Sequence, residues 1–174
     1  MTFAQMIFEV IDMRSFSNLW YWLMLAVAWS MASHFVLGVP FDMIIRARRH
    51  GGAAEADLHE LVRINCARLL YYARHGGVWI VGFGMAFLTM LALLGFVYGI
   101  EFAQALFLLI FPLSFVSVLS MAAAEQIATT GLAGEALYRK LRQHRFITQL
   151  VGMFSLLVTA LWGMYQNFTI GPFG

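Results

Sequence analysis

The residue with the most distinctive chemistry is His34, which lies inside a long apolar stretch from Leu19 to Ile45. An ionisable side chain within a membrane segment is costly, so such a residue is a functional candidate by default. Ser30 lies one helical turn earlier, and a neutral imidazole hydrogen-bonded to a serine or a backbone carbonyl is the structural interpretation. Proton relay and quinone contact are functional alternatives. Haem ligation by two histidines needs a second histidine at the same depth, and the other apolar stretches contain none.

Two carboxylates lie at the ends of apolar stretches. Asp42 follows Pro40, which removes a backbone donor and can kink a helix. We expect Asp42 to lie at the inner headgroup level and to pair with Arg46, one turn later. Glu125 has the corresponding position at the end of another apolar stretch. The candidate functional polar residues in the membrane are therefore His34, Asp42, Ser30 and Glu125.

Two polar connections carry ten of the eleven Lys and Arg residues. Neighbouring arginines would repel a metal ion, whereas clustered Lys and Arg at a membrane surface attract anionic head groups. The candidate contacts with lipid head groups or a partner protein are Arg46, Arg48, Arg49, Arg63, Arg68, Arg74, His75, Arg142, His144 and Arg145.

The sequence has no nucleophile–base pair, phosphate-binding glycine loop, dinucleotide fingerprint or zinc-ligand spacing. Cys66 is the single cysteine, which excludes an intramolecular disulfide and a multi-cysteine metal or iron–sulfur site. We therefore predict no catalytic residue, no cofactor and no metal site, and a protein that is not an enzyme.

The composition predicts the elements that position these residues. The chain is 61% hydrophobic and 11% charged, whereas an ordinary soluble domain is about 25% charged. Spanning about 30 Å of hydrocarbon takes about 20 apolar residues in a helix. Four stretches meet this requirement: 19–45, 78–100, 102–124 and 146–168. The expected fold is an all-α bundle of four transmembrane helices that forms a single domain over residues 1–174.

The basic residues also predict the orientation, because Lys and Arg stay on the cytoplasmic side of a membrane. The two long connections hold these residues, and the turn around Gly99 and the tail after Gln166 hold none. Both termini should therefore lie on the outer side.

Two further segments have helical patterns. Residues 3–14 are amphipathic and are expected to lie along the outer interface. Residues 53–74, between Gly51-Gly52 and Gly76-Gly77, repeat apolar residues every three or four positions. This second segment is predicted to be a cytoplasmic amphipathic helix on the membrane or against a partner. Ser15, Ser17 and Asn18 are N-cap candidates for the first span.

Each span carries small or polar residues at helical spacing, and such stripes mediate close helix packing in membranes. A tightly packed bundle and a surface for partner helices are both compatible with them. Pro112, in the third span, is interpreted as a kink supported by neighbouring serines. The stripes are Ala26, Ser30, His34 and Gly38; Gly95 and Gly99; Ser114, Ser117 and Ser120; and Gly152, Ser155, Thr159 and Gly163.

Several segments resemble an uncharacterised family of bacterial four-helix inner-membrane proteins. They are FEVIDMRSFSNLWYW at 8–22, SH at 33–34, LGVPFD at 37–42 and TALWGMYQN at 159–167. Members of this family are often labelled "component of SufBCD complex", after the iron–sulfur assembly scaffold. The resemblance covers nearly the whole chain. It implies a bacterial inner-membrane location and no catalytic residues.

The leading hypothesis is a non-enzymatic accessory or assembly subunit of a larger inner-membrane complex. The alternative is a small transporter or channel, as a single chain or as an oligomer, and a third interpretation is a redox accessory that uses His34. The expected partners are the lipid bilayer with its anionic lipids and other membrane proteins or further copies of this chain. We expect no nucleic-acid partner.

Overall fold

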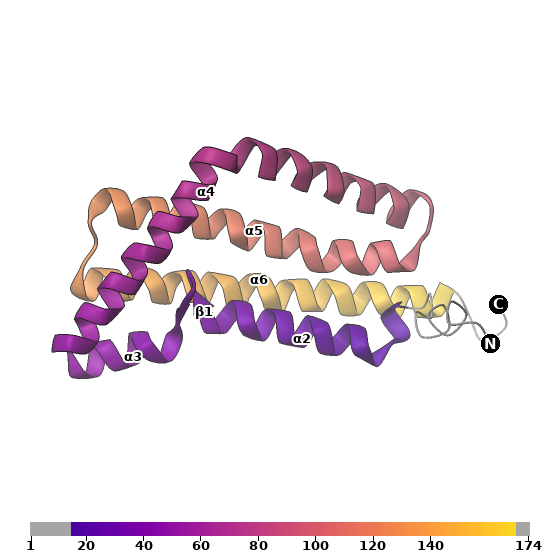
Figure 1. Ribbon diagram of the computed structural model, residues 1–174. Coiled ribbons are helices and arrows are strands. Elements are labelled where there is room, and N and C mark those ends of the chain that lie inside the picture. The colour runs from indigo at the N-terminus through magenta and orange to yellow at the C-terminus, as the bar shows by residue number, and fades with distance from the viewer. Residues whose placement is uncertain (1–14, 170–174) are drawn as a thin grey trace, which may run out of the picture.

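The computed structural model describes residues 15–169, and about 91% of them are helical (Figure 1). The predicted outer helix at residues 3–14 lies outside this range. The elements in chain order are η1 (Ser15–Ser17), α2 (Leu19–His34), β1 (Phe35–Val36), β2 (Val39–Pro40), α3 (Phe41–His50), α4 (Gly52–Ala92), the π-helical turn η2 (Leu93–Val97), α5 (Glu101–Thr130) and α6 (Gly134–Thr169).

Three helices are long and apolar enough to cross a membrane: α4 continued by η2, α5 and α6. The first of these covers the second predicted span as far as Val97. Helices α5 and α6 contain the third and fourth predicted spans and extend beyond them into the polar connections. Helix α2 has 16 residues. At about 1.5 Å per residue, it extends about 24 Å, which is less than the hydrocarbon thickness of about 30 Å.

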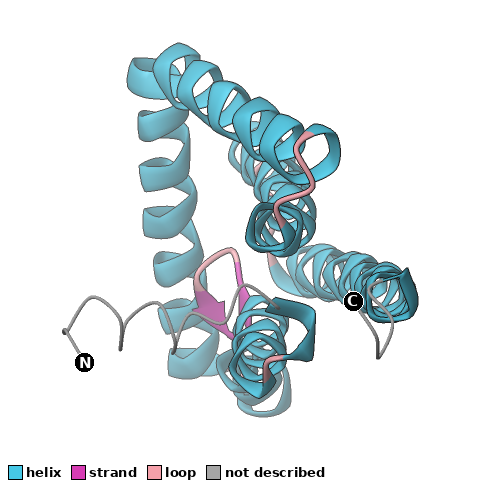
Figure 2. Ribbon diagram, turned by 90° about the vertical axis from the view of Figure 1, so that its right-hand side faces the viewer, coloured by secondary structure: helices cyan, strands magenta, loops and turns pink. Residues whose placement is uncertain are grey.

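The first predicted span is interrupted. Residues 19–45 do not form one helix, because α2 ends at His34 and an antiparallel hairpin of β1 and β2 follows. Leu37 and Gly38 form its turn, with φ of 52° and 76°. Pro40 then precedes α3, where its missing N–H costs no helical hydrogen bond. The prediction of one continuous helix was therefore wrong, and Pro40 does not kink a helix but stands at the N-terminal end of α3. Figure 2 shows the hairpin in magenta between the helices.

Helix α4 joins two segments that the sequence analysis separates. The amphipathic helix predicted at 53–74 continues through Gly76 and Gly77 into the apolar second span. A glycine costs a helix about 1 kcal/mol, whereas an unpaired backbone group in hydrocarbon costs several. The helical hydrogen bonds therefore persist across the glycine pair. Figure 1 shows that α4 bends part-way along its length.

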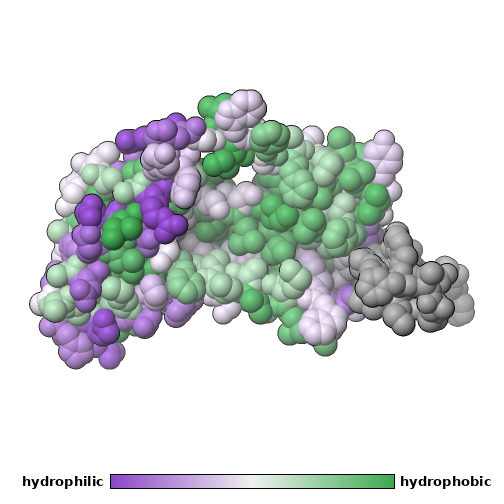
Figure 3. Space-filling view, in the orientation of Figure 1, coloured by the Kyte–Doolittle hydropathy of each residue, from purple (hydrophilic) through white to green (hydrophobic). Residues whose placement is uncertain are grey.

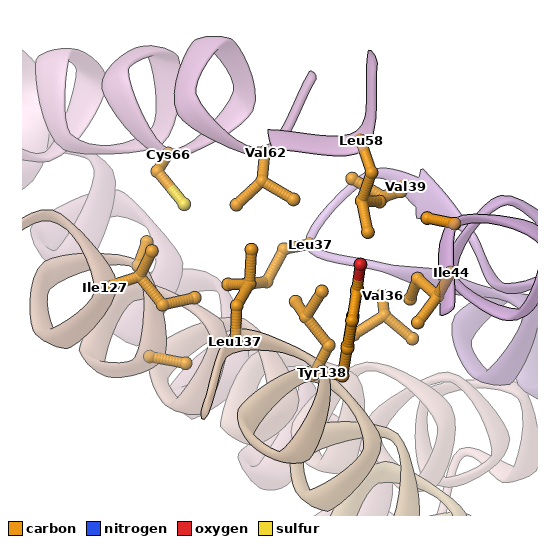
Figure 4. Close-up of a cluster of buried hydrophobic side chains, with 14 residues drawn as sticks. Val36, Leu37, Val39, Ile44, Leu58, Val62, Cys66, Ile127, Leu137 and Tyr138 are labelled. Carbon is orange, nitrogen blue, oxygen red and sulfur yellow. The ribbon is translucent and has the colours of Figure 1, made fainter. Parts of the chain in front are cut away.

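The amphipathic part of α4 packs against its own bundle. Leu58, Val62 and Cys66 join a buried cluster with residues of the hairpin, α3, α5 and α6, which we call the inner core (Figure 4). Its members are Val36, Leu37, Val39, Ile44, Ala47, Leu58, Val62, Cys66, Ala123, Ala124, Ile127, Leu137, Tyr138 and Leu141. The buried face of this segment is thus covered by the chain itself, which differs from the prediction of a membrane or partner surface.

Helix α6 supplies the central packing stripe. Gly152, Ser155, Thr159 and Gly163 are all buried, as predicted for the small-residue stripe of the fourth span. A second cluster, built around Leu25 and Trp29 of α2, packs between α2, α5 and α6. Asn18 caps α2, since its side-chain oxygen accepts a hydrogen bond from the Trp20 N–H at 2.9 Å.

The two ends of the molecule differ in polarity. Figure 3 shows hydrophilic side chains gathered at one end, where α3 and the α5–α6 connection lie, and apolar side chains along the rest of this face. At the opposite end, Ser17 of η1 donates a hydrogen bond to the Asn167 side chain of α6 at 3.0 Å. Segments from the start and the finish of the described chain therefore meet at the end that lacks the basic cluster.

Candidate functional site

The polar residues predicted within the first span lie on the outside of the bundle. Ala26, Ser30 and His34 are exposed on α2, and Gly38 is exposed in the hairpin turn that follows. The His34 ring meets Phe35 edge to face at a centroid distance of 5.0 Å. The predicted packing stripe of the first span is therefore wrong, because Leu25 and Trp29 make the contacts of α2 instead.

The predicted carboxylates are also exposed. Asp42 lies in the first turn of α3, and Glu125 lies near the end of α5. Within residues 15–169, Asp42 and Arg46 form no ion pair. The structure thus brings none of these four polar candidates together in one cavity.

The apolar half of α4 is sparsely covered by the rest of the described chain. Only 11% of its apolar window is buried, the same share as in α5 and less than the 28% in α6. Its large side chains, such as Val78 and Phe83, are exposed. At three of its glycines, Gly77, Gly82 and Gly84, an added Cβ would have no described atom within 4 Å other than those of the adjoining residues and turns of α4 itself. We call residues 77–85 the open α4 segment.

Other glycines in the bundle are closely packed, because a neighbouring helix occupies the space that a side chain would need. A Cβ on Gly152 would lie 2.8 Å from Cε3 of Trp29, and one on Gly95 would lie 2.8 Å from the backbone N of Gln104. Gly95 and Gly99 do not form a common packing face as predicted, because Gly99 lies in the turn after η2 with φ of 72°.

Gln104 is a buried polar residue that the sequence analysis missed. Its Nε2 donates to the Gly95 carbonyl at 2.8 Å, and its Oε1 accepts from Trp162 Nε1 at 2.9 Å and from Gln166 Nε2. This side chain therefore joins η2, α5 and α6. Although π-helical turns often mark functional sites, this hydrogen-bonded arrangement fits a structural role. The sequence feature that could have indicated this buried residue is a single amide side chain within the apolar run of α5.

A wide apolar groove of about 650 Å³ runs between α5 and α6, with Phe111, Phe115 and Phe154 among its lining residues. Pro112 cannot donate to the carbonyl of Leu108, four residues earlier. Ser155 of α6 donates its hydroxyl to that carbonyl at 3.4 Å. The contact agrees with the predicted support of Pro112 by a serine, which here comes from the neighbouring helix.

Three predicted basic residues converge at the polar end. Arg48 and Arg49 of α3 and Arg142 of α6 line a cavity of about 470 Å³ with Phe41 and Ile44. We call it the arginine cavity. Arg48 also pairs with Glu135 of α6 at 3.1 Å.

Arg145 is held beside this cavity by two different contacts. Its Nε donates to the Ser33 carbonyl at 3.1 Å, and its guanidinium lies 3.7 Å from the centre of the Phe41 ring. It thus satisfies a carbonyl at the end of α2 and fixes the position of Phe41 by a cation–π contact.

The remaining basic candidates are separate from the arginine cavity. Arg63 is paired with Glu60 on the surface of α4, and His75 contacts the Tyr71 carbonyl at 3.0 Å. Arg46, Arg68 and Arg74 are exposed.

His144 is buried, and its Nε2 lies 3.1 Å from the Ser120 hydroxyl. The interpretation of His144 as a head-group contact is therefore wrong, because its side chain packs inside the bundle and Arg142 occupies the surface instead.

Comparison with known proteins finds no matching family model, no matching curated protein and no matching solved structure. The resemblance to a bacterial inner-membrane family therefore stays a prediction.

Proposed function

We propose that this chain is a non-enzymatic accessory or assembly subunit that packs against the helices of other proteins in a bacterial inner membrane. The observation that carries the proposal is the open α4 segment, an apolar helical surface with three uncovered glycines. Helices in lipid associate through close contact of small residues, because lipid tails compete equally well for large apolar side chains. Uncovered glycines let a partner backbone approach closely.

The arrangement of these glycines favours one face of α4. Gly77 and Gly84 are seven residues apart, so they are displaced by only about 20° around the helix. Gly82 lies on a different face, about 140° from Gly77. A partner helix is therefore expected to lie along Gly77 and Gly84.

The proposal includes four membrane crossings with both termini on the outer side. Two contacts support it. Ser17 and Asn167 meet at one end, and Arg48 and Glu135 meet at the basic end. A crossing by α2, completed by the hairpin and α3, connects these two ends.

The alternative function, a small transporter or channel, receives less support. A transport path needs polar groups that line a common cavity. His34, Asp42 and Glu125 are exposed and are spread over three helices. The groove between α5 and α6 is lined almost entirely by apolar side chains.

The test is mass spectrometry of the tagged protein, extracted in mild detergent at its native expression level. We expect a defined set of membrane proteins to co-purify in constant ratio with the wild-type chain. A Gly77→Leu/Gly84→Leu variant should lose this set, because the added side chains block close approach. Gly82→Leu is the matched control and should keep it.

Two outcomes contradict the proposal. One is retention of the same partners by the double variant. The other is recovery of the wild-type chain alone. Recovery as a homo-oligomer would make transport the leading function, with His34→Ala the first variant to test for flux.

A further inference from the structure

The arginine cavity has the chemistry of a phosphate site with an apolar floor. Arginines from two helices line it: Arg48 and Arg49 from α3 and Arg142 from α6. Phe41, Ile44 and Ile45 of α3 line the same cavity with apolar surface. A ligand that fits both surfaces carries an anionic group next to an apolar part.

The charge within the cavity is only partly neutralised. Glu135 pairs with Arg48, and both side chains of this pair are about half exposed. Within residues 15–169, Arg49 and Arg142 have no carboxylate partner. Like charges in one cavity repel each other, so an anion that binds between them relieves that repulsion. Arginine suits phosphate in particular, because its planar guanidinium donates two parallel hydrogen bonds to phosphate oxygens.

The position of the cavity in the fold identifies the source of the phosphate. Helix α3 is amphipathic: Ile44 and Ala47 are buried, while Arg48 and Arg49 are exposed. It lies where the apolar helices give way to the polar end of the molecule (Figure 3). Basic pockets between membrane helices at this level bind lipid head groups.

We propose that the arginine cavity binds the phosphate of an anionic membrane lipid, with Arg49 and Arg142 as the principal contacts. Arg48 contributes in competition with Glu135. Phe41, whose ring is held by Arg145, and Ile45 contact the apolar part of the lipid next to the head group. The site does not depend on a protein partner and is therefore independent of the proposed function.

The test is thermal unfolding of the purified full-length chain in a neutral detergent, titrated separately with phosphatidylglycerol, phosphatidylcholine and inorganic phosphate. A ligand that binds only the folded state raises the unfolding temperature as its concentration exceeds Kd. We expect phosphatidylglycerol to raise the unfolding temperature of the wild-type protein and the other two compounds to leave it unchanged.

Two sets of variants locate the site. Arg49→Gln/Arg142→Gln should weaken phosphatidylglycerol binding by about tenfold or more, since each arginine near the surface contributes to the attraction. Arg68→Gln/Arg74→Gln removes the same charge from α4, outside the cavity, and should bind as the wild type does. Glu135→Gln should tighten binding several-fold, because it frees Arg48.

Three outcomes would overturn the proposal. Equal binding by the wild type and by Arg49→Gln/Arg142→Gln would show that the cavity is not the site. An equal loss in Arg68→Gln/Arg74→Gln would indicate diffuse attraction by net charge. A full shift with inorganic phosphate would assign the site to a free anion. Should the double variant fail to fold, Glu135→Gln alone decides, since unchanged affinity in that variant contradicts a site that includes Arg48.

Discussion

Gly152 and Gly84 have opposite surroundings: Gly152 is closely packed, and Gly84 faces open space. Gly152 lies against the indole ring of Trp29, where an added Cβ would be 2.8 Å from the nearest ring carbon. At Gly84 the corresponding position has no described atom within 4 Å other than those of the adjoining residues and turns of α4 itself. Gly152 is needed for the packing of α6 against α2, and Gly84 leaves space on the surface of α4 for another molecule.

Gly152→Ala should therefore destabilise the protein by about 1–3 kcal/mol, the usual cost of overpacking. Gly84→Ala is the matched control, and it should keep or slightly raise stability because alanine favours a helix more than glycine does. Thermal unfolding of both variants in the same detergent measures the difference. A Gly152→Ala protein as stable as the control would show that Trp29 moves freely and that α2 and α6 are not tightly packed.

The inner core contains a tyrosine, Tyr138, whose hydroxyl group makes no hydrogen bond with the described residues. Its hydroxyl is buried and has no hydrogen-bond partner among the described residues. Figure 4 shows it pointing toward Leu58. A buried hydroxyl without a partner lowers stability, so the ring, more than the hydroxyl, accounts for the contribution of this residue to the core.

At the scale of elements, the hairpin between α2 and α3 is the feature that depends most on backbone conformation. Gly38 has φ of 76°, and a Cβ there would lie 3.1 Å from Nδ2 of Asn65 on α4. Leu37 also has a positive φ, and its side chain is buried in the inner core. Burial of Leu37 offsets the backbone strain that its conformation costs.

Gly38→Ala should destabilise the protein by about 1–2 kcal/mol, because residues with a Cβ are strained in the left-handed region. Gly82→Ala, in a regular and uncovered part of α4, serves as the control. Chemical denaturation of the two variants, followed by circular dichroism, gives the comparison. Equal stabilities would mean that the turn adopts another conformation in the membrane.

The elements differ in how far the sequence predicts them. The α6 stripe is readable because Gly152, Ser155 and Thr159 repeat at helical spacing on one buried face. The hairpin is not readable from hydropathy, since residues 19–45 are apolar throughout and only Pro40 signals a break. The α2 stripe misleads because small and polar residues also occur on faces that the bundle leaves open.

The candidate sites are also only partly predictable from the sequence. The individual arginines can be named from the sequence, because a basic connection marks the inner membrane surface. Which of them meet is decided by the crossing of α3 and α6, which brings Arg142 to Arg48 from nearly a hundred residues away. Gln104 is missed for a similar reason, because its partners lie on other helices and one amide in an apolar run carries no spacing pattern.

At the scale of the whole molecule, the described residues 15–169 place their Lys and Arg side chains toward one end and none at the end where Ser17 meets Asn167. Single-cysteine labelling tests whether these ends lie on opposite sides of the membrane. In a Cys66→Ala background, Tyr98→Cys and Ser17→Cys should react with a membrane-impermeant maleimide in intact cells. Ala53→Cys and Ala133→Cys should react only after lysis, since they lie in the basic connections.

The labelling pattern at the four positions also gives the number of membrane crossings. Opposite labelling of Ser17→Cys and Ala53→Cys requires that α2, the hairpin and α3 cross the membrane. The same labelling for both would leave three crossings and contradict the proposed topology. Each variant labels after denaturation, which serves as the control for expression and reactivity.

Synthesis from the N-terminus imposes a time order on the inner core. Its side chains come from four distant parts of the chain, from Val36 in the hairpin through Leu58 and Ile127 to Leu141 in α6. About 100 residues separate the first of these from the last, and translation at about 5–20 residues per second takes about 5–20 seconds to add them. Until Leu141 is synthesised, the parts of the earlier helices that belong to the inner core cannot complete their packing. During that interval the nascent chain depends on the lipid bilayer, or on another protein, to hold those ends in place.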